Sequence, residues 1–198
     1  MENQTNTEII CILDKSGSMH SLQAETIAGL NNFIKNQQQE EGLCNFTLVQ
    51  FNQEVTVTIK REPILNVQIL TAESYQPDGY TALLDAVGDT LQTAMETQFF
   101  LANSESPARV LVFIITDGME NASTCYSKPQ ILKMIKDLTI NKGWEFQFFG
   151  ANIDAFSEAQ TIGISKDQAK QWSYNKEGVN YMMNEISEKS SEFRKRKI

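Results

Sequence analysis

The sequence is poor in histidine and cysteine. Its 198 residues include one histidine, His20, and three widely spaced cysteines, Cys11, Cys44 and Cys125. An odd number of unclustered cysteines favours buried, reduced thiols over a disulfide framework or a zinc site, and the cytoplasm is the expected compartment. Catalysis of the Ser-His-Asp or Cys-His type could use His20 alone. The sequence therefore predicts a protein that is not an enzyme.

Basic charge and long hydrophobic runs are also scarce. The chain has 17 Lys and Arg against 25 Asp and Glu, a formal net charge of −8, which argues against nucleic-acid binding because that requires a basic face. The one basic cluster, residues 194–197, is predicted to be a solvated chain end. No apolar run approaches the ~18 residues of a membrane-spanning helix, and the polar N-terminus is not typical of a secretory signal. We therefore expect neither a nucleic-acid nor a membrane partner.

The length and composition are typical of one compact domain. With 41% apolar residues, the chain has enough material for a sizeable core. No repeat, low-complexity segment or linker divides it. We expect a single domain over residues 1–198, with a core at about 7–190 and frayed tails at 1–6 and 192–198.

Two hydrophobic periodicities alternate along the chain. Apolar runs of strand length are followed by segments with apolar residues at helical spacing. This alternation indicates an α/β fold with a mainly parallel sheet and helices on both faces. The expected strands are 9–13, 44–51, 110–115, 144–149 and 171–174, and the expected helices are 21–38, 66–72, 82–100, about 129–138, 154–162 and about 179–186.

One further segment has a different pattern. Val55, Val57 and Ile59 alternate strictly with polar residues after a short turn at residues 52–53. Strict alternation after a short turn predicts an antiparallel hairpin with one solvated face, which belongs at the edge of a sheet.

Oxygen-bearing side chains follow the buried strands where those strands end. The apolar run 9–13 ends in Asp14, and Ser16 and Ser18 follow at spacings of two. Asp117 follows the run 110–115, and Thr81 precedes the long helix. In parallel α/β sheets, ligands bind at the carboxyl ends of strands where the strand order reverses. Two carboxylates and three hydroxyls suit the hard oxygen ligation of magnesium.

Each of these features also has a structural interpretation. The serines at 16, 18 or 21 could cap the start of a helix. Thr-Asp-Gly at 116–118 is a common turn at a strand end, and Thr81 could merely cap the helix that follows it. The three features occur together, each at a strand end or a helix start, and this combination favours metal binding.

The same motifs resemble those of a known family. Asp14-Lys15-Ser16-Gly17-Ser18-Met19, Gly79-Tyr80-Thr81-Ala82-Leu83 and Ile114-Ile115-Thr116-Asp117-Gly118 are similar to the motifs of the von Willebrand factor A domain and its metal-ion-dependent adhesion site. The resemblance implies a Rossmann-like three-layer α/β/α fold with a mostly parallel central sheet and one antiparallel edge strand. It implies a magnesium or manganese ion held by Asp14, Ser16, Ser18, Thr81 and Asp117.

The resemblance also implies how such a site is used. An acidic side chain, Glu or Asp, of a partner protein would complete the metal coordination. Asp85 and Asn121 flank the motifs and could support the ligands from behind. The chain is similar to the small stand-alone bacterial or phage members of the family, which often act as contact modules in multiprotein complexes. Because they adjoin the ligand loops, the expected partner contacts are Met19, His20, Tyr80, Met119 and Glu120.

Two other functions stay open at this point. A metal-dependent hydrolase or phosphatase would use an ion-activated water, although the sequence has no Gly-rich phosphate loop followed by Lys-Ser/Thr. A structural subunit with a vestigial site is the second alternative. Coupling of the C-terminal helix to the metal site is a further hypothesis that the resemblance suggests.

Overall fold

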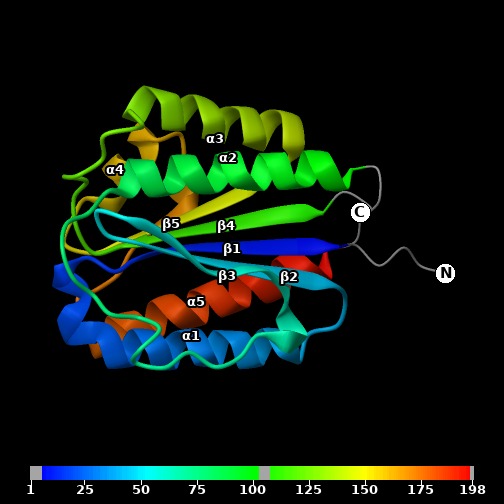
Figure 1. Ribbon diagram of the computed structural model, residues 1–198, viewed down its shortest axis with the longest axis horizontal. Coiled ribbons are helices and arrows are strands. Elements are labelled where there is room, and N and C mark those ends of the chain that lie inside the picture. The colour runs from blue at the N-terminus through cyan, green and yellow to red at the C-terminus, as the bar shows by residue number, and fades with distance from the viewer. Residues whose placement is uncertain (1–5, 103–107, 197–198) are drawn as a thin grey trace.

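The computed structural model describes residues 6–102 and 108–196. A six-stranded sheet in the order β3-β2-β1-β4-β5-β6 lies between two layers of helices (Figure 1). This is the α/β/α arrangement that the sequence predicts. The strands are β1 (Thr7–Asp14), β2 (Cys44–Phe51), β3 (Val55–Pro63), β4 (Arg109–Thr116), β5 (Glu145–Gly150) and β6 (Ala169–Gln171). The α-helices are α1 (Gln23–Gln38), α2 (Leu83–Leu101), α3 (Lys128–Lys142), α4 (Ala155–Thr161) and α5 (Lys176–Lys195).

The strand order reverses beside β1. This strand pairs in parallel with β2 on one side and β4 on the other, so the chain moves outward in opposite directions from the centre. Every residue of β1 is buried, as expected for a β-branched run covered by helices on both faces. The reversal leaves a crevice at the carboxyl ends of β1 and β4. The sequence places Asp14 and Asp117 at these two strand ends.

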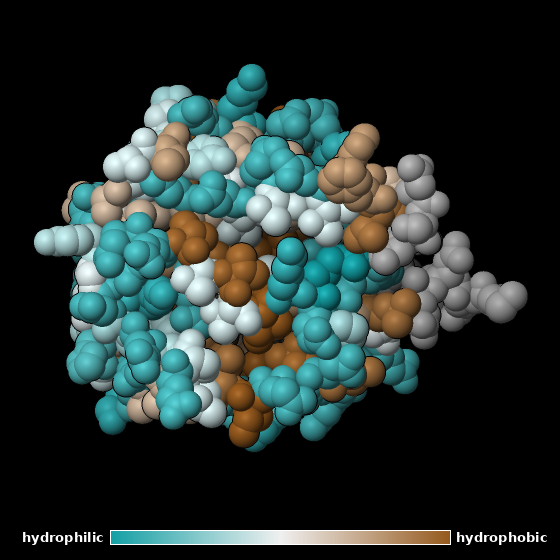
Figure 2. All heavy atoms as spheres, viewed as in Figure 1, coloured by the Kyte–Doolittle hydropathy of each residue, from teal (hydrophilic) through white to brown (hydrophobic). Residues whose placement is uncertain are grey.

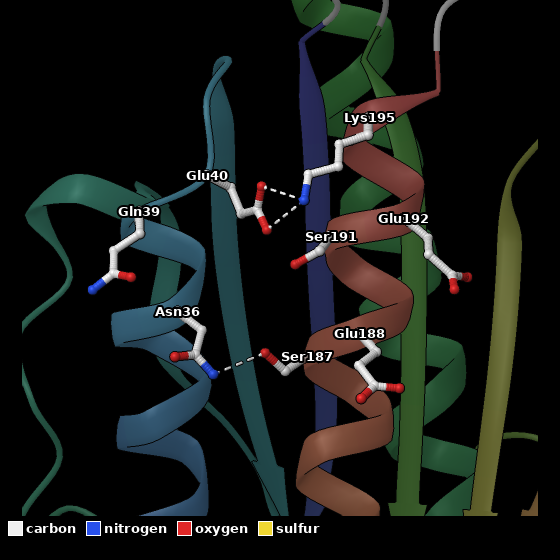
Figure 3. A pocket seen from close by; sticks show the side chains of 8 residues that line it. All are labelled: Asn36, Gln39, Glu40, Ser187, Glu188, Ser191, Glu192 and Lys195. Carbon is white, nitrogen blue, oxygen red and sulfur yellow. Dashed lines mark hydrogen bonds and ion pairs between the residues drawn. The ribbon is translucent and has the colours of Figure 1, made fainter.

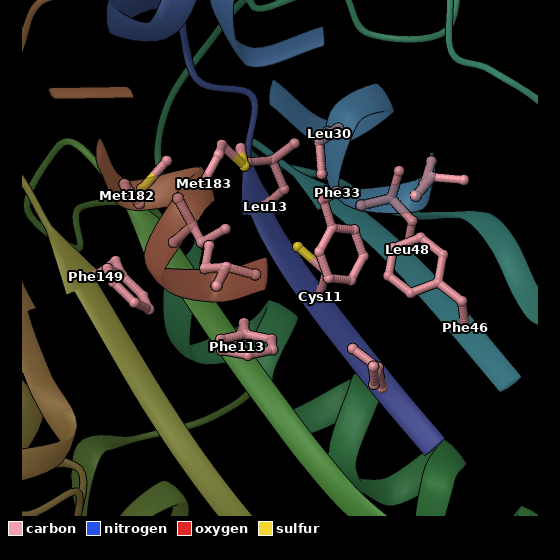
Figure 4. Close-up of a cluster of buried hydrophobic side chains, with 14 of the residues drawn as sticks. Cys11, Leu13, Leu30, Phe33, Phe46, Leu48, Phe113, Phe149, Met182 and Met183 are labelled. Carbon is pink, nitrogen blue, oxygen red and sulfur yellow. The ribbon is translucent and has the colours of Figure 1, made fainter. Parts of the chain in front are cut away.

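Two hydrophobic cores fill the space between sheet and helices. Successive side chains of a strand point to opposite faces, so Cys11 and Leu13 pack under α1 and α5, whereas Ile10 and Ile12 pack under α2 and α3. Figure 4 shows the first core, where aromatic side chains of the sheet meet Met182 and Met183 of α5. The two methionines are packing residues, as the sequence predicts.

The edge strand β3 is antiparallel to β2, which confirms the expected hairpin. In Figure 1, β3 runs between the two layers of helices. Figure 2 has the same orientation and shows apolar side chains gathered between these layers. The pairing with β2 is irregular near Leu48, and Arg61 has a left-handed backbone conformation with φ of 45°. Such irregularity, together with the charges of Lys60 and Arg61, discourages pairing with another strand at this edge.

The helix expected at 66–72 is wrong. A short 3₁₀ turn at Ile64–Asn66 is followed by extended chain that runs along α1. The side chain of Asn31 bonds both backbone groups of Leu70, at 2.7 Å to its N–H and 2.9 Å to its carbonyl. Gln38 similarly donates to the carbonyls of Ile64 and Val67. Side chains of α1 therefore satisfy the polar groups that a helix would otherwise bond within itself.

The strand expected at 171–174 is also misplaced. β6 spans Ala169–Gln171, because it pairs with the last three residues of β5. Beyond it, Trp172 donates its N–H to the carbonyl of Gly150, and the chain turns into α5 with Asn175 as its N-cap.

The frayed tail expected from residue 192 is wrong as far as Lys195. Helix α5 continues to this residue, and the side chain of Phe193 is buried. The buried guanidinium of Arg194 donates to the carbonyls of Gln37, Glu40 and Gly42 at 2.6, 3.0 and 3.0 Å. One arginine thus satisfies a carbonyl in the last turn of α1 and two carbonyls of the turn that follows the helix. Residues 1–5 and 197–198 of the expected tails lie outside the described residues.

Within residues 6–102 and 108–196, no helix combines the length and the apolar character that crossing a membrane requires.

Candidate metal centre

Asp14 and Asp117 meet in the crevice beside β1. The register of β1 and β4 pairs Leu13 with Ile115, so the residues that follow come together at the strand ends. Both carboxylates are almost completely buried, with 0% and 1% of the residue exposed. Two buried carboxylates from strands of one sheet are far apart in sequence and adjacent in space, which identifies this crevice as the candidate site.

Asp14 is held by three neighbours, two at its side chain and one at its backbone. Its Oδ1 accepts the N–H of Ser16 at 2.7 Å, and its Oδ2 accepts the hydroxyl of Thr116 at 2.6 Å. The hydroxyl of Tyr75, a fully buried residue, donates to the backbone carbonyl of Asp14 at 2.7 Å. This carboxylate is therefore oriented by the protein itself, without a ligand.

Asp117 is held on one oxygen only. Its Oδ1 accepts the hydroxyl of Ser18 at 2.8 Å, and the Ser18 Oγ lies 3.2 Å from the Oγ of Ser16. Its Oδ2 is buried and has no hydrogen-bond partner among the residues that the structure describes. A buried carboxylate oxygen without a partner is costly. A cation bound between the two aspartates would supply that missing interaction.

The electrostatics of the crevice favour the same conclusion. Burial, with the charge of Asp14 as a smaller contribution, raises the pKa of Asp117 to about 6, although the hydrogen bond from Ser18 opposes this rise. Burial likewise raises the pKa of Asp14, although the hydrogen bonds from Ser16 and Thr116 oppose this rise. The site therefore disfavours two negative charges together unless a positive charge is added.

Thr81 reaches the crevice from a third loop. It is buried, and its backbone N–H and carbonyl bond to Asn121 Oδ1 and N at 2.9 and 3.0 Å. A Cβ placed on Gly118 would lie 3.8 Å from the Thr81 Oγ1, so this hydroxyl lies beside the turn after Asp117. The N–H of Gly17 donates to the carbonyl of Gly79 at 3.0 Å and joins this loop to the first one.

The structure thus brings the five predicted ligand residues together. Four of them, Asp14, Ser16, Ser18 and Asp117, form one hydrogen-bonded chain that includes Thr116, and Thr81 adjoins it. Among the described residues, no group of three or more His, Cys, Asp or Glu side chains could hold a metal ion. A set of two carboxylates with three hydroxyls suits a hard, oxygen-preferring cation instead.

The predicted supporting residues have separate roles. Asn121 holds Thr81, as described above. The carboxylate of Asp85 accepts the N–H groups of Thr124, Cys125 and Tyr126 at 2.8 to 2.9 Å. Asp85 therefore anchors the far end of the loop that carries Asn121, and acts on the site through the backbone.

One of the expected partner contacts, Met19, is wrong, and the carboxylate of a second, the half-buried Glu120, is bonded within the protein. Met19 is completely buried, because the 3₁₀ turn Gly17–Leu22 directs its side chain into the core. Glu120 turns inward, where its carboxylate accepts the N–H groups of Leu84, Ala122 and Ser123 at 2.7 to 2.9 Å. It stabilises the start of α2 and the adjoining loop.

The other expected contacts are accessible. Tyr80 and Met119 are 69% and 66% exposed, and His20 is also exposed. Their positions beside the ligand loops follow directly from the sequence.

Three residues that shape the site were not identified from the sequence. Thr116 could have been recognised, because it precedes Asp117 at the end of the strand that pairs with β1. Tyr75 and Tyr174 lie in irregular segments that carry no such signal. The hydroxyl of Tyr174, just before α5, donates to the backbone carbonyl of Ser18 and lies 2.9 Å from the Ser21 Oγ.

Two pockets on the described surface lie away from this crevice. One, of about 590 Å³, lies between α1 and α5 and is lined by polar side chains, including the ion pair of Glu40 and Lys195 (Figure 3). The other, of about 440 Å³, adjoins Phe99 near the end of α2. Neither is lined by a residue of the aspartate crevice.

Comparisons of the sequence with protein-family models and with curated proteins give no match. The structure does match solved structures. It is similar to proximal thread matrix protein 1 from the mussel byssus, whose metal-ion-dependent adhesion site (MIDAS) motif is occupied by zinc. The TM-score is 0.63, and the identity is 17% over 95% of this chain and 48% of that one. The chain thus spans about half the length of the mussel protein.

Two further structures show the same similarity. Manganese-loaded TRAP protein from Plasmodium vivax has a TM-score of 0.61 and 18% identity over 91% of this chain and 72% of that one. The von Willebrand factor domain of the type V pili tip protein Mfa5 from Porphyromonas gingivalis has a TM-score of 0.65 and 9% identity, over 98% of both chains. The chain has the von Willebrand factor A fold, and some structures of this fold carry a divalent metal.

Proposed function

We propose that this protein is a divalent-cation-dependent protein-binding module and not an enzyme. A magnesium or manganese ion is held by Asp14, Ser16, Ser18, Thr81 and Asp117. It binds a Glu or Asp side chain of a partner protein. The observation that carries this proposal is the buried Oδ2 of Asp117, which has no hydrogen-bond partner within residues 6–102 and 108–196 and lies in a crevice shared with the second buried aspartate.

The charges of the ligand set support an external carboxylate. Asp14 and Asp117 together balance a dication, while the three hydroxyls are neutral. An ion of this kind prefers about six oxygen ligands, so a position not filled by the protein is open to water or to a carboxylate from outside. Structures of the same fold that hold zinc or manganese, and one from a pilus tip, agree with a role in adhesion.

The surroundings of the two aspartates favour binding over catalysis. Among the residues that the structure describes, the side chains that bond directly to Asp14 and Asp117 are the hydroxyls of Ser16, Ser18, Thr116 and Tyr75. Burial raises the pKa of Tyr75 well above its ordinary value, so none of these groups is a general base near neutral pH. The three free cysteines, two of them buried, are consistent with a reducing compartment such as the cytoplasm.

Calorimetry tests the metal site directly. Magnesium chloride titrated into the chelator-treated protein should bind at one site, and the Ser16→Ala/Ser18→Ala variant should bind at least tenfold more weakly. Ser165→Ala changes an exposed serine outside the ligand loops and should bind like the wild type. At 100 times the dissociation constant, the ion should stabilise the fold by about 2.7 kcal/mol, which is about 5–11 °C in Tm at this chain length.

A second experiment tests the partner. A pull-down performed in magnesium and in chelator, and read by mass spectrometry, should recover a partner in magnesium alone. The Ser16→Ala/Ser18→Ala variant should lose that partner. No binding heat together with an unchanged Tm in magnesium would favour a structural subunit with a vestigial site. Metal-dependent hydrolysis of a phosphate ester would favour an enzyme.

A further inference from the structure

The metal face exposes two large apolar side chains, Tyr80 and Met119. Tyr80 directly precedes Thr81, and Met119 directly follows the Asp117-Gly118 turn. They are 69% and 66% exposed. Helix α2 begins just after Thr81, whereas the most exposed phenylalanines lie in its last turn, at the opposite end of the sheet (Figure 1). The apolar pair therefore belongs specifically to the rim of the crevice.

The loops that carry this pair are joined and held in place. The carbonyl of Thr81 accepts the N–H groups of Asn121 and Ala122 at 3.0 and 3.2 Å, so the Tyr80 loop and the Met119 loop are bonded to each other. The N–H of Tyr80 donates to Gln53 Oε1 at 3.0 Å. The two side chains are thus carried by loops whose backbones are bonded to each other and to Gln53, which lowers the entropic cost of binding to them.

The charged side chains of the same loops have partners within the protein. Glu120 bonds to the start of α2. The Nζ of Lys15 lies 3.4 Å from Thr56 Oγ1, and the carboxylate of Asp78 accepts the N–H of Gly79 at 2.8 Å. An ion balanced by Asp14 and Asp117 adds no net charge. The charged groups of these loops are thus hydrogen-bonded within the protein, whereas Tyr80 and Met119 are large apolar side chains that the loops leave exposed.

We infer that the partner presents its acidic side chain beside an aromatic or aliphatic one, within one or two residues, and that this apolar side chain packs against Tyr80 and Met119. The inference rests on the proposed function, since the metal binds the carboxylate. The ion supplies the same attraction for any Glu or Asp, so the apolar pair determines which acidic segments are selected. Exposed apolar surface at a binding site is the usual marker of such selection.

A peptide selection tests this inference. A phage-displayed library of random heptapeptides is bound to the immobilised protein in magnesium chloride and eluted with chelator. Three proteins are compared: the wild type, Tyr80→Ser/Met119→Ser, and Phe99→Ser/Phe100→Ser. The last variant removes two apolar side chains, each 76% exposed, far from the metal face. Magnesium affinity, measured by calorimetry, should stay within twofold in all three.

The expected peptides from the wild type and the Phe99/Phe100 variant carry Asp or Glu next to an aromatic or aliphatic residue. Those from the Tyr80/Met119 variant should keep the acid and lose the apolar neighbour. A synthetic selected peptide should bind this variant about 5- to 30-fold more weakly than the wild type. Acidic peptides without an apolar preference, or a preference that survives in the variant, would overturn the inference and leave the proposed function intact. No acidic enrichment at all would overturn both.

Discussion

Replacing Asp117 with asparagine should make the metal-free protein more stable and remove its response to magnesium. The wild-type carboxylate is buried near Asp14, and one of its oxygens has no partner. An asparagine keeps the shape and an oxygen that can accept the hydroxyl of Ser18, but carries no charge. The substitution therefore removes like-charge repulsion from the crevice together with a metal ligand.

The size of this effect follows from the pKa of Asp117. Burial, with the charge of Asp14 as a smaller contribution, raises this pKa from 3.8 to about 6. Each unit corresponds to about 1.4 kcal/mol, so ionisation of Asp117 costs the folded state up to about 3 kcal/mol at neutral pH. We expect Asp117→Asn to gain about 1–3 kcal/mol in chelator, which is a rise in Tm of roughly 2–12 °C at this chain length.

The dependence on pH has a definite sign. The pKa of Asp117 is higher in the folded than in the unfolded state, so the cost is fully present above about pH 6 and disappears as the pH falls toward 3.8. The stability difference between variant and wild type should therefore shrink between about pH 7.5 and about pH 5. Magnesium should also stabilise the wild type less at the lower pH, because protons compete with the metal for the carboxylates.

Thermal unfolding followed by circular dichroism, in chelator and in magnesium at both pH values, measures these effects. Asp137→Asn changes an exposed aspartate of α3 and is the matched control, with an expected change within about 0.5 kcal/mol. The reasoning is refuted if Asp117→Asn is less stable than the wild type in chelator, or if magnesium still raises its Tm.

Three other substitutions test individual contacts. Tyr174→Phe removes the hydroxyl that donates to the Ser18 carbonyl. It should weaken magnesium binding about 3- to 10-fold in calorimetry and lower the free energy of unfolding in chelator by about 1 kcal/mol or less. Unchanged magnesium affinity would contradict a role of Tyr174 in positioning the loop. Arg194→Met leaves the carbonyls at and just after the end of α1 without their donor. It should lower the free energy of unfolding in urea by about 2–4 kcal/mol, whereas the exposed Arg196→Met should lower it by under about 1 kcal/mol. Equal losses would refute the capping role. Glu120→Gln weakens the hydrogen bonds at the start of α2 and should speed hydrogen exchange in the adjoining loop about tenfold; unchanged exchange would refute its anchoring role.

The fold class could be predicted because its signals are local. An apolar, isoleucine-rich run such as 9–13, buried on both faces, predicts a parallel strand. The alternation of Val55, Val57 and Ile59 with polar residues predicts an edge hairpin. The failures lie where tertiary contacts replaced local hydrogen bonds. Residues 66–72 have a helix-like apolar spacing. Their backbone groups are instead bonded by Asn31 and Gln38 of α1, a helix that lies earlier in the sequence and packs beside them.

The C-terminal segment failed for a related reason. A run of four cations is typical of a solvated tail, and nothing local distinguishes Arg194 from its neighbours. Its guanidinium is buried because helix α5 places it at the free carbonyls of α1, more than 150 residues earlier in the chain. The stability that this contact contributes depends on where helix α1 ends. A local sequence pattern around Arg194 contains no information about that helix end.

The candidate site shows the same division. The sequence by itself determined which oxygen donors lie at strand ends or before a helix, because each of the three loops carries its own motif. Parallel strands then bring Asp14 and Asp117 to one edge of the sheet. Only the tertiary structure decided how these groups are held and which of their neighbours are available. Met19 is inside the core, Glu120 bonds to the start of α2, and one oxygen of Asp117 is left without a partner. Side-chain direction and burial depend on contacts between segments far apart in the chain, and these contacts exist only once the chain has folded.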